Sequence, residues 1–166
     1  THVSILASYI NRAQGRHMEQ ALRVLAYLIA TKDYEQMLGP DENGNLDLEG
    51  YGDVSYAGEE NRKSRIGGVI RYGCSVLDTL SKRHKESTPL STCEGEVVSA
   101  SEAAKRLLYF QEVIQEIGAP QLTKPAVLHC DNQAAIALST HNKILQKSRH
   151  IEIRYLAWRE WLEQGR

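Results

Sequence analysis

The chain has 166 residues, 42% of them apolar, so it is long enough for one ordinary hydrophobic core and short for two domains of usual size. Its 20 Lys and Arg nearly balance its 21 Asp and Glu, which excludes a polybasic arm and an acidic tail. Three cysteines without a CxxC pair predict a reducing compartment, and neither a disulfide framework nor a zinc site. No apolar run is long enough to span a membrane.

Charge is segregated along the chain although the total is balanced. Residues 41–60 carry seven acidic side chains and no basic one, whereas residues 61–85 carry seven basic side chains and one acidic one. A second basic stretch covers residues 143–154. Two interpretations remain open on charge alone: solvated faces that alternate in sign, or a carboxylate-lined site flanked by surfaces that bind phosphates.

The first 38 residues are expected to be helical. A short helix is predicted over residues 3–11, and a second follows a break near Gly15. Its apolar residues recur at i, i+3 and i+4, which places on one face Met18, Ala21, Leu22, Leu25, Leu28 and Ile29. Residues 39–45, GPDENGN, give the strongest turn signal. We therefore expect a helical preface (1–38), a linker (39–45) and a main domain (46–166).

The hydrophobic period changes to two after the linker. Residues 46–56 alternate as in a strand with two different faces, and residues 65–72 and 75–81 predict two further strands. The step from Tyr72 to Gly73 fits the hairpin turn between them.

The second half of the main domain is predicted to mix helices with one more strand. A long helix is expected over residues 94–117, followed by a short buried strand over 126–130. Helices are then expected over 132–139 and 151–163. This order predicts a mixed α/β fold with one sheet.

Three acids fall at the ends of these elements: Asp53 on the first strand, Glu96 in the first turn of the long helix, and Asp131 after the fourth strand. Each has a structural explanation when taken singly. Asp53 could face solvent, Glu96 could be stabilised by the helix dipole as an acid in the first turn, and Asp131 could cap the next helix.

Together the three acids predict a metal site. If the first and fourth strands are neighbours and the helix packs on them, the carboxylates converge, and converging carboxylates need cations to stay ionised. Hard oxygen ligands prefer Mg²⁺ or Mn²⁺. Two such ions are the usual device for in-line phosphoryl displacement.

Several ordered motifs resemble the ribonuclease H domain of copia-type LTR retrotransposon Pol polyproteins. The matching segments are 50–58 (GYGDVSYAG), 62–68 (RKSRIGG), 90–103 (LSTCEGEVVSASEA), 130–138 (CDNQAAIAL) and 149–155 (RHIEIRY). Residues 21–28 (ALRVLAYL) and 31–34 (TKDY) resemble the end of the preceding reverse transcriptase. The resemblance covers nearly the whole chain.

The resemblance implies a ribonuclease H-like fold in which three antiparallel strands and a parallel fourth are flanked by helices. It implies cleavage of the RNA strand of RNA–DNA hybrids with two Mg²⁺ or Mn²⁺ ions. Asp53, Glu96 and Asp131 match the family's catalytic carboxylates. Glu94 is the alternative to Glu96, because both belong to the Glu-x-Glu signature; we favour Glu96, which shares a helix face with Ala100.

The expected partners are the RNA–DNA hybrid and the reverse transcriptase portion of the same polyprotein, and no membrane. Side chains predicted to bind phosphates come from the basic stretches. They are Lys63, Lys82, Arg83, Lys85, Lys147, Arg149 and His150. The resemblance implies a cytoplasmic location in a virus-like particle, a nuclear location as a second possibility, and no secretion.

The chain also departs from the family pattern. The family continues with a fifth strand and a further helix that carries a fourth metal-binding Asp, so we expect a piece of a longer protein whose ribonuclease H domain is C-terminally incomplete. An alternative function is therefore a catalytically impaired or host-adopted module that binds nucleic acid or a protein partner. An integrase-type nuclease of the same superfamily is disfavoured, because its Glu should follow Asp131.

Overall fold

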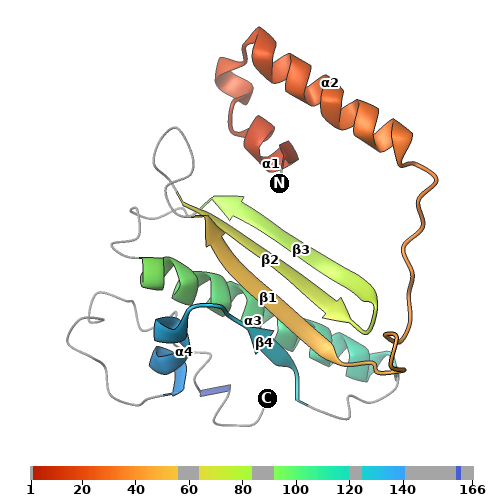
Figure 1. The fold of residues 1–166 in the computed structure, drawn as a ribbon, viewed down its shortest axis with the longest axis vertical. Coiled ribbons are helices and arrows are strands. Elements are labelled where there is room, and N and C mark those ends of the chain that lie inside the picture. The colour runs from red at the N-terminus through yellow and green to blue at the C-terminus, as the bar shows by residue number, and fades with distance from the viewer. Residues whose placement is uncertain (1, 56–63, 84–91, 120–124, 141–159, 162–166) are drawn as a thin grey trace. The chain divides into compact units, whose positions relative to one another are not determined.

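The computed structural model describes residues 2–55, 64–83, 92–119, 125–140 and 160–161 (Figure 1). The chain divides into two compact units, Thr1–Gln36 and Met37–Arg166. Each unit has its own secondary structure, helical in the first and mixed in the second. None of the helices within the described residues is long and apolar enough to cross a membrane.

The first unit contains α1 (His2–Ala7), a single 3₁₀ turn (Ile10–Arg12) and α2 (Gly15–Ala30). The helix expected over residues 3–11 is therefore shorter than predicted. Ser8 ends it, because its N–H and its hydroxyl both donate to the carbonyl of Ile5, at 3.0 and 2.7 Å.

The apolar residues of α2 keep the predicted helical spacing, but the helix buries none of its residues. Of the predicted apolar stripe, the side chains that remain more than half exposed are Met18, Leu22, Leu25, Leu28 and Ile29. The apolar face of this amphipathic helix is thus largely exposed.

The second unit is built on a four-stranded sheet of order β3-β2-β1-β4 (Figure 1). The strands are β1 (Leu48–Ser55), β2 (Arg65–Tyr72), β3 (Ser75–Arg83) and β4 (Val127–His129). The first three form an antiparallel meander, and β4 pairs with β1 in parallel. This arrangement confirms the mixed sheet expected from the sequence.

The β2–β3 turn is fixed by a close approach of the segment before β1. Gly73 has a φ of +58°, and a Cβ there would lie 2.3 Å from the carbonyl oxygen of Gly39. The N–H of Cys74 donates to the same carbonyl at 3.0 Å. Residues 39–45, expected to be a linker, are therefore folded onto the hairpin of the second unit.

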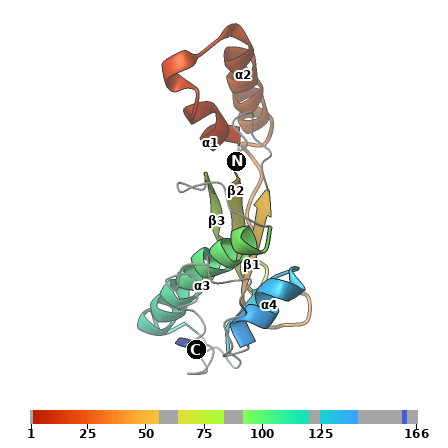
Figure 2. The same ribbon diagram turned by 90° about the vertical axis from the view of Figure 1, so that its left-hand side faces the viewer.

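Helix α3 (Thr92–Glu116) packs on one face of the sheet (Figure 2). On β1, this face carries Gly50, Gly52 and Val54. A Cβ on Gly50 would lie 2.7 Å from Leu107, so the absence of a side chain lets the helix approach the strand. The main core cluster between helix and sheet contains Leu48, Ile70, Leu107 and Ile114.

The last described elements follow β4. Helix α4 (Gln133–Thr140) contacts α3. Of the helix expected over residues 151–163, only Glu160 and Trp161 belong to the described residues, and both are helical. Trp161 packs against a small cluster on α3 formed by Ala100 and Ala104.

Candidate metal centre

Asp53 lies near the C-terminal end of β1, on the face opposite the core. Its neighbour Val54 is buried on the helix side, as the alternation in the sequence predicted. The main chain of Asp53 is held from the helix side of the sheet by Ser99 of α3, whose hydroxyl donates to the Asp53 carbonyl at 2.9 Å. One oxygen of the Asp53 carboxylate accepts the N–H of Val54 at 2.7 Å.

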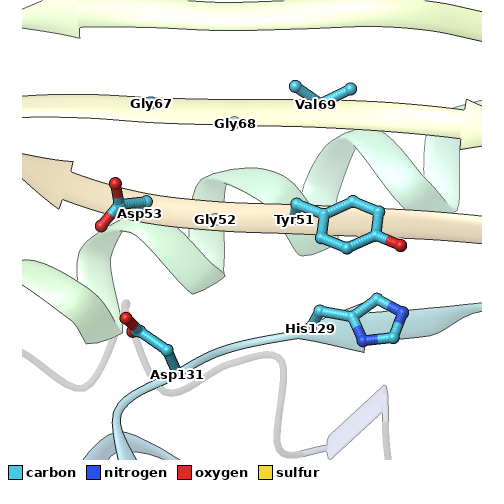
Figure 3. Close-up of a pocket in the computed structure, with 8 residues that line it drawn as sticks. All are labelled: Tyr51, Gly52, Asp53, Gly67, Gly68, Val69, His129 and Asp131. Atoms are coloured by element: carbon cyan, nitrogen blue, oxygen red, sulfur yellow. The ribbon is translucent and has the colours of Figure 1, made fainter.

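Asp131 is placed beside Asp53 by the parallel pairing of β1 with β4. His129 is the register partner of Tyr51, so Asp131 follows the strand by the same two residues that separate Asp53 from Tyr51. Figure 3 shows both carboxylates at the same end of the pocket. The condition set by the sequence, that the first and fourth strands be neighbours, is therefore met.

Asp131 does not cap the helix that follows it, which corrects one alternative drawn from the sequence. The cap is Asn132, whose side-chain oxygen accepts the N–H groups of Ala134 and Ala135, both at 3.0 Å. Because α4 begins one residue later than expected, the Asp131 carboxylate is not used by the helix end.

Glu96 approaches the same place from α3. It is 5% exposed, and its Oε2 has no hydrogen-bond partner among the described residues. Burial, and then the negative charges of Asp131 and Asp53, together raise the pKa of Glu96 to about 7. An ionised carboxylate in this position lacks the hydrogen bonds that a buried charge requires.

The structure distinguishes the two glutamates at the start of α3. Glu94 lies in the first turn and is half-buried, whereas Glu96 is buried on the side of the sheet. Only Glu96 belongs to the group that contains Asp131.

The residues fit a divalent metal ion. One ligand atom each of Glu96, Cys130 and Asp131 lie within 4.8 Å of one another. Asp53 is outside this group, but its charge still acts on Glu96. The unpartnered Glu96 oxygen is the observation that most requires a cation, because a cation would restore the interaction that burial removes.

A pocket of about 390 Å³ extends from the acids along β1, β2 and β4 (Figure 3). Asp53 and Asp131 lie at one end, and a stacked pair formed by Tyr51 and His129, with ring centroids 4.5 Å apart, lies at the other. The backbone of Gly67 and Gly68 lines the wall on β2. Its lack of side chains leaves room beside the carboxylates.

Two of the predicted phosphate-binding residues belong to the described part of the chain. Lys82 and Arg83 end β3, and Lys82 forms an ion pair with Glu102 of α3. Because β3 runs in the same direction as β1, both residues lie at the end of the sheet that carries Asp53. The remaining predicted residues lie outside the described residues: Lys63, Lys85, Lys147, Arg149 and His150.

The sequence did not predict that Cys130 lies beside Glu96 and Asp131 in the candidate metal centre. Its spacing from any other cysteine gives no metal signature, and its proximity to Glu96 arises only when α3 packs against the end of β4. The stacked pair of Tyr51 and His129 was missed for the same reason, since it depends on strand register. The one signal in the sequence is that Cys130 directly precedes Asp131.

The fold and the site define an α/β protein with a carboxylate cluster at the carboxyl ends of two neighbouring parallel strands, where α/β sheets place their ligands. No protein-family model matches the chain. The chain is, however, similar to retrotransposon Pol polyproteins of two plants.

In Nicotiana tabacum the relative is the retrovirus-related Pol polyprotein from transposon TNT 1-94, 30% identical over 97% of this chain. In Arabidopsis thaliana they are the Pol polyproteins from transposons RE1 and RE2, 28% and 30% identical over 98% of this chain. The chain spans only 11–12% of the length of these relatives. The similarity supports a retrotransposon Pol origin.

Proposed function

We propose that this chain is a ribonuclease H domain that cleaves the RNA strand of RNA–DNA hybrids during reverse transcription of a retroelement. The single observation that carries the proposal is the burial of Glu96 against Asp131, with one carboxylate oxygen left unpartnered and with the charge of Asp53 nearby. The similarity of the chain to retrotransposon Pol polyproteins supports a function in a retroelement.

Asp53, Glu96 and Asp131 would hold two Mg²⁺ or Mn²⁺ ions. When bound, these ions would activate the attacking water and stabilise the charge on the leaving oxygen. Glu96 supplies an oxygen that the protein shields from water. The hydrogen bond from Ser99 fixes the backbone of Asp53, so that its carboxylate is held on a rigid strand rather than on a loop.

The substrate would be recognised through its shape and backbone. The pocket beside Asp53 is lined by glycine backbone on β2, which leaves room for a sugar next to the scissile phosphate. Contacts to 2′-hydroxyls would then distinguish RNA from DNA. Lys82 and Arg83, at the same end of the sheet, would bind phosphates. The reverse transcriptase portion of the polyprotein would be the partner that generates the hybrid.

The test is cleavage of a labelled RNA–DNA hybrid by the whole chain in Mg²⁺ and in Mn²⁺. Asp53→Asn, Glu96→Gln and Asp131→Asn should each lower the rate by about 100-fold or more, because each removes a negative charge that would hold the metal ions, and the metal ions offset the developing negative charge. Glu94→Gln is the matched control, since it makes the same change two residues away and outside the cluster; it should cleave at a rate close to that of the wild type.

Equal inactivity of the wild type and the three variants would contradict the proposal. Hybrid binding without cleavage would then favour the alternative of a catalytically impaired or host-adopted binding module. Loss of cleavage in Glu94→Gln with retention in Glu96→Gln would assign the role to the other glutamate.

A further inference from the structure

One member of the candidate metal centre is a thiol. The Sγ of Cys130 lies within 4.8 Å of a carboxylate oxygen of Glu96 and of Asp131, and Cys130 is half-buried. It packs together with Cys93 against the buried side chains of Val97 and Ala135. The thiol is therefore directed into the protein beside the two acids rather than into solvent.

We propose that Glu96, Cys130 and Asp131 form a mixed thiolate–carboxylate site that binds Zn²⁺ in preference to Mg²⁺. Thiolate is a soft ligand that favours zinc and related transition metals, whereas Mg²⁺ favours oxygen ligands alone. Three protein ligands and one open position are the usual complement of an accessible zinc site. A coordinated thiol loses its proton to solvent when the ion binds.

The geometry is close to what zinc requires. With Zn–S near 2.3 Å and Zn–O near 2.1 Å, tetrahedral ligands lie about 3.5 Å from one another. The three ligand atoms here lie within 4.8 Å of one another. Side-chain rotations that shorten these separations by at most about 1.3 Å would therefore complete the site.

Glu96 gives independent support for a ligand at this place. Its side chain is 5% exposed, and its Oε2 accepts no hydrogen bond from the described residues. A cation held jointly by this oxygen and the Cys130 thiolate would satisfy both groups. The cysteine spacing predicted no zinc site; the three ligands come instead from α3 and from the chain that follows β4, and they meet only in the folded protein.

Zinc at this site would occupy two of the carboxylates that hold Mg²⁺ in the proposed nuclease. Zn²⁺ should therefore act as an inhibitor that competes with Mg²⁺. This consequence rests on the proposed function, whereas zinc binding itself does not.

The experiment is a titration of the whole 166-residue chain with Co²⁺, followed by absorption spectroscopy without nucleic acid. Co²⁺ replaces Zn²⁺ in tetrahedral sites, and a cobalt–thiolate bond gives a charge-transfer band. We expect one ion per chain with this band, and loss of the band when Zn²⁺ displaces the cobalt. Cys130→Ser should abolish the band and weaken binding by more than about tenfold.

Cys74→Ser is the matched control, because Cys74 lies in the β2–β3 turn and should leave the band unchanged. Glu96→Gln should weaken cobalt binding but keep the band, which provides a second test if Cys130→Ser fails to fold. A band that survives Cys130→Ser, or a wild type that binds Co²⁺ without the band, would overturn the proposal. Cleavage in Mg²⁺ is measured separately, so a chain that shows the band but cleaves no hybrid would retain the zinc site and lose the proposed function.

Discussion

Glu96 is the residue at which structure and function conflict most directly. In the folded protein its pKa is raised to about 7, chiefly by burial, from the value of 4.5 that applies to the unfolded chain. Between these two values the folded state binds more protons than the unfolded state. The free energy of unfolding must therefore fall as the pH rises through this range.

We predict that the metal-free protein loses roughly 3 kcal/mol of stability between pH 4.5 and pH 8 through this one group. Glu96→Gln removes the titrating group, so the free energy of unfolding of the variant should increase relative to that of the wild type as the pH rises. Urea unfolding in the presence of a chelator, at several pH values, measures both proteins. Parallel curves for wild type and Glu96→Gln would contradict the prediction, and Mg²⁺ should reduce the difference by binding the ionised carboxylate.

At the scale of elements, the position of the site depends on how α3 is attached to the sheet. Ser99 donates its hydroxyl to the carbonyls of Asp53 at 2.9 Å and Gly67 at 3.2 Å, which links the helix to β1 and β2 next to the carboxylates. Ser101, two residues further along α3, is equally buried, but its hydroxyl has no partner among the described residues.

This contrast gives a matched pair of substitutions. Ser99→Ala should lower the free energy of unfolding by about 1–2 kcal/mol, because it removes the hydrogen bonds that the buried Ser99 hydroxyl donates to the carbonyls of β1 and β2. Ser101→Ala should be neutral or slightly stabilising, because it removes an unsatisfied buried hydroxyl. Urea unfolding of both variants tests the pair. Equal losses in the two would show that side-chain volume, and not the hydrogen bond to the Asp53 backbone, decides the stability.

The sequence predicted the elements whose patterns are strongest. The bounds of β2 agree with those expected, because period-two alternation and the flanking turn both mark them. Helix α3 and the parallel strand β4 differ from expectation by one or two residues at each end. Asp131 was open to a capping role because Asp and Asn are equally good caps. Only the observed end of β4 shows that Asn132 takes that role.

The candidate site was partly predictable for a physical reason. Asp53, Glu96 and Asp131 follow from motifs with ordered spacing, whereas contact between Cys130 and Glu96 depends on tertiary packing that no local pattern records. The exposed face of α2 shows the same limit. Helical spacing fixes which residues share a face, but not whether that face is covered.

At the scale of the whole molecule, the net charge of −1 is a poor guide to nucleic-acid binding. Three of the acids, Asp53, Glu96 and Asp131, approach one another at the candidate metal centre, and the bases Lys82 and Arg83 lie at the same end of the sheet. Lys82 is the register partner of Ile66, and Ile66 is the partner of Val54. Lys82 therefore lies about 10 Å from β1, on the helix side of the sheet that also carries Val54, whereas Asp53 is on the opposite face. A phosphate bound by Lys82 would lie at the same end of the sheet as the metal centre, but on its helix side.

Two lysines that share one acidic partner allow this arrangement to be tested. Lys82 and Lys105 both pair with Glu102, and their side chains are 44% and 49% exposed. Lys105 lies nine residues beyond Glu96 on α3, about 13 Å along the helix axis from the metal centre. Loss of either ion pair should change the free energy of unfolding by no more than about 1 kcal/mol.

We predict that Lys82→Ala weakens hybrid binding and makes log K fall less steeply with log salt concentration. The magnitude of the slope should decrease by about one, because one phosphate contact is lost. Lys105→Ala should leave the slope unchanged. Fluorescence anisotropy with a labelled hybrid, at several salt concentrations, measures both variants under conditions without cleavage. Equal slopes for Lys82→Ala and the wild type would place the backbone of the hybrid elsewhere on the molecule, since the two lysines are matched in exposure and in partner.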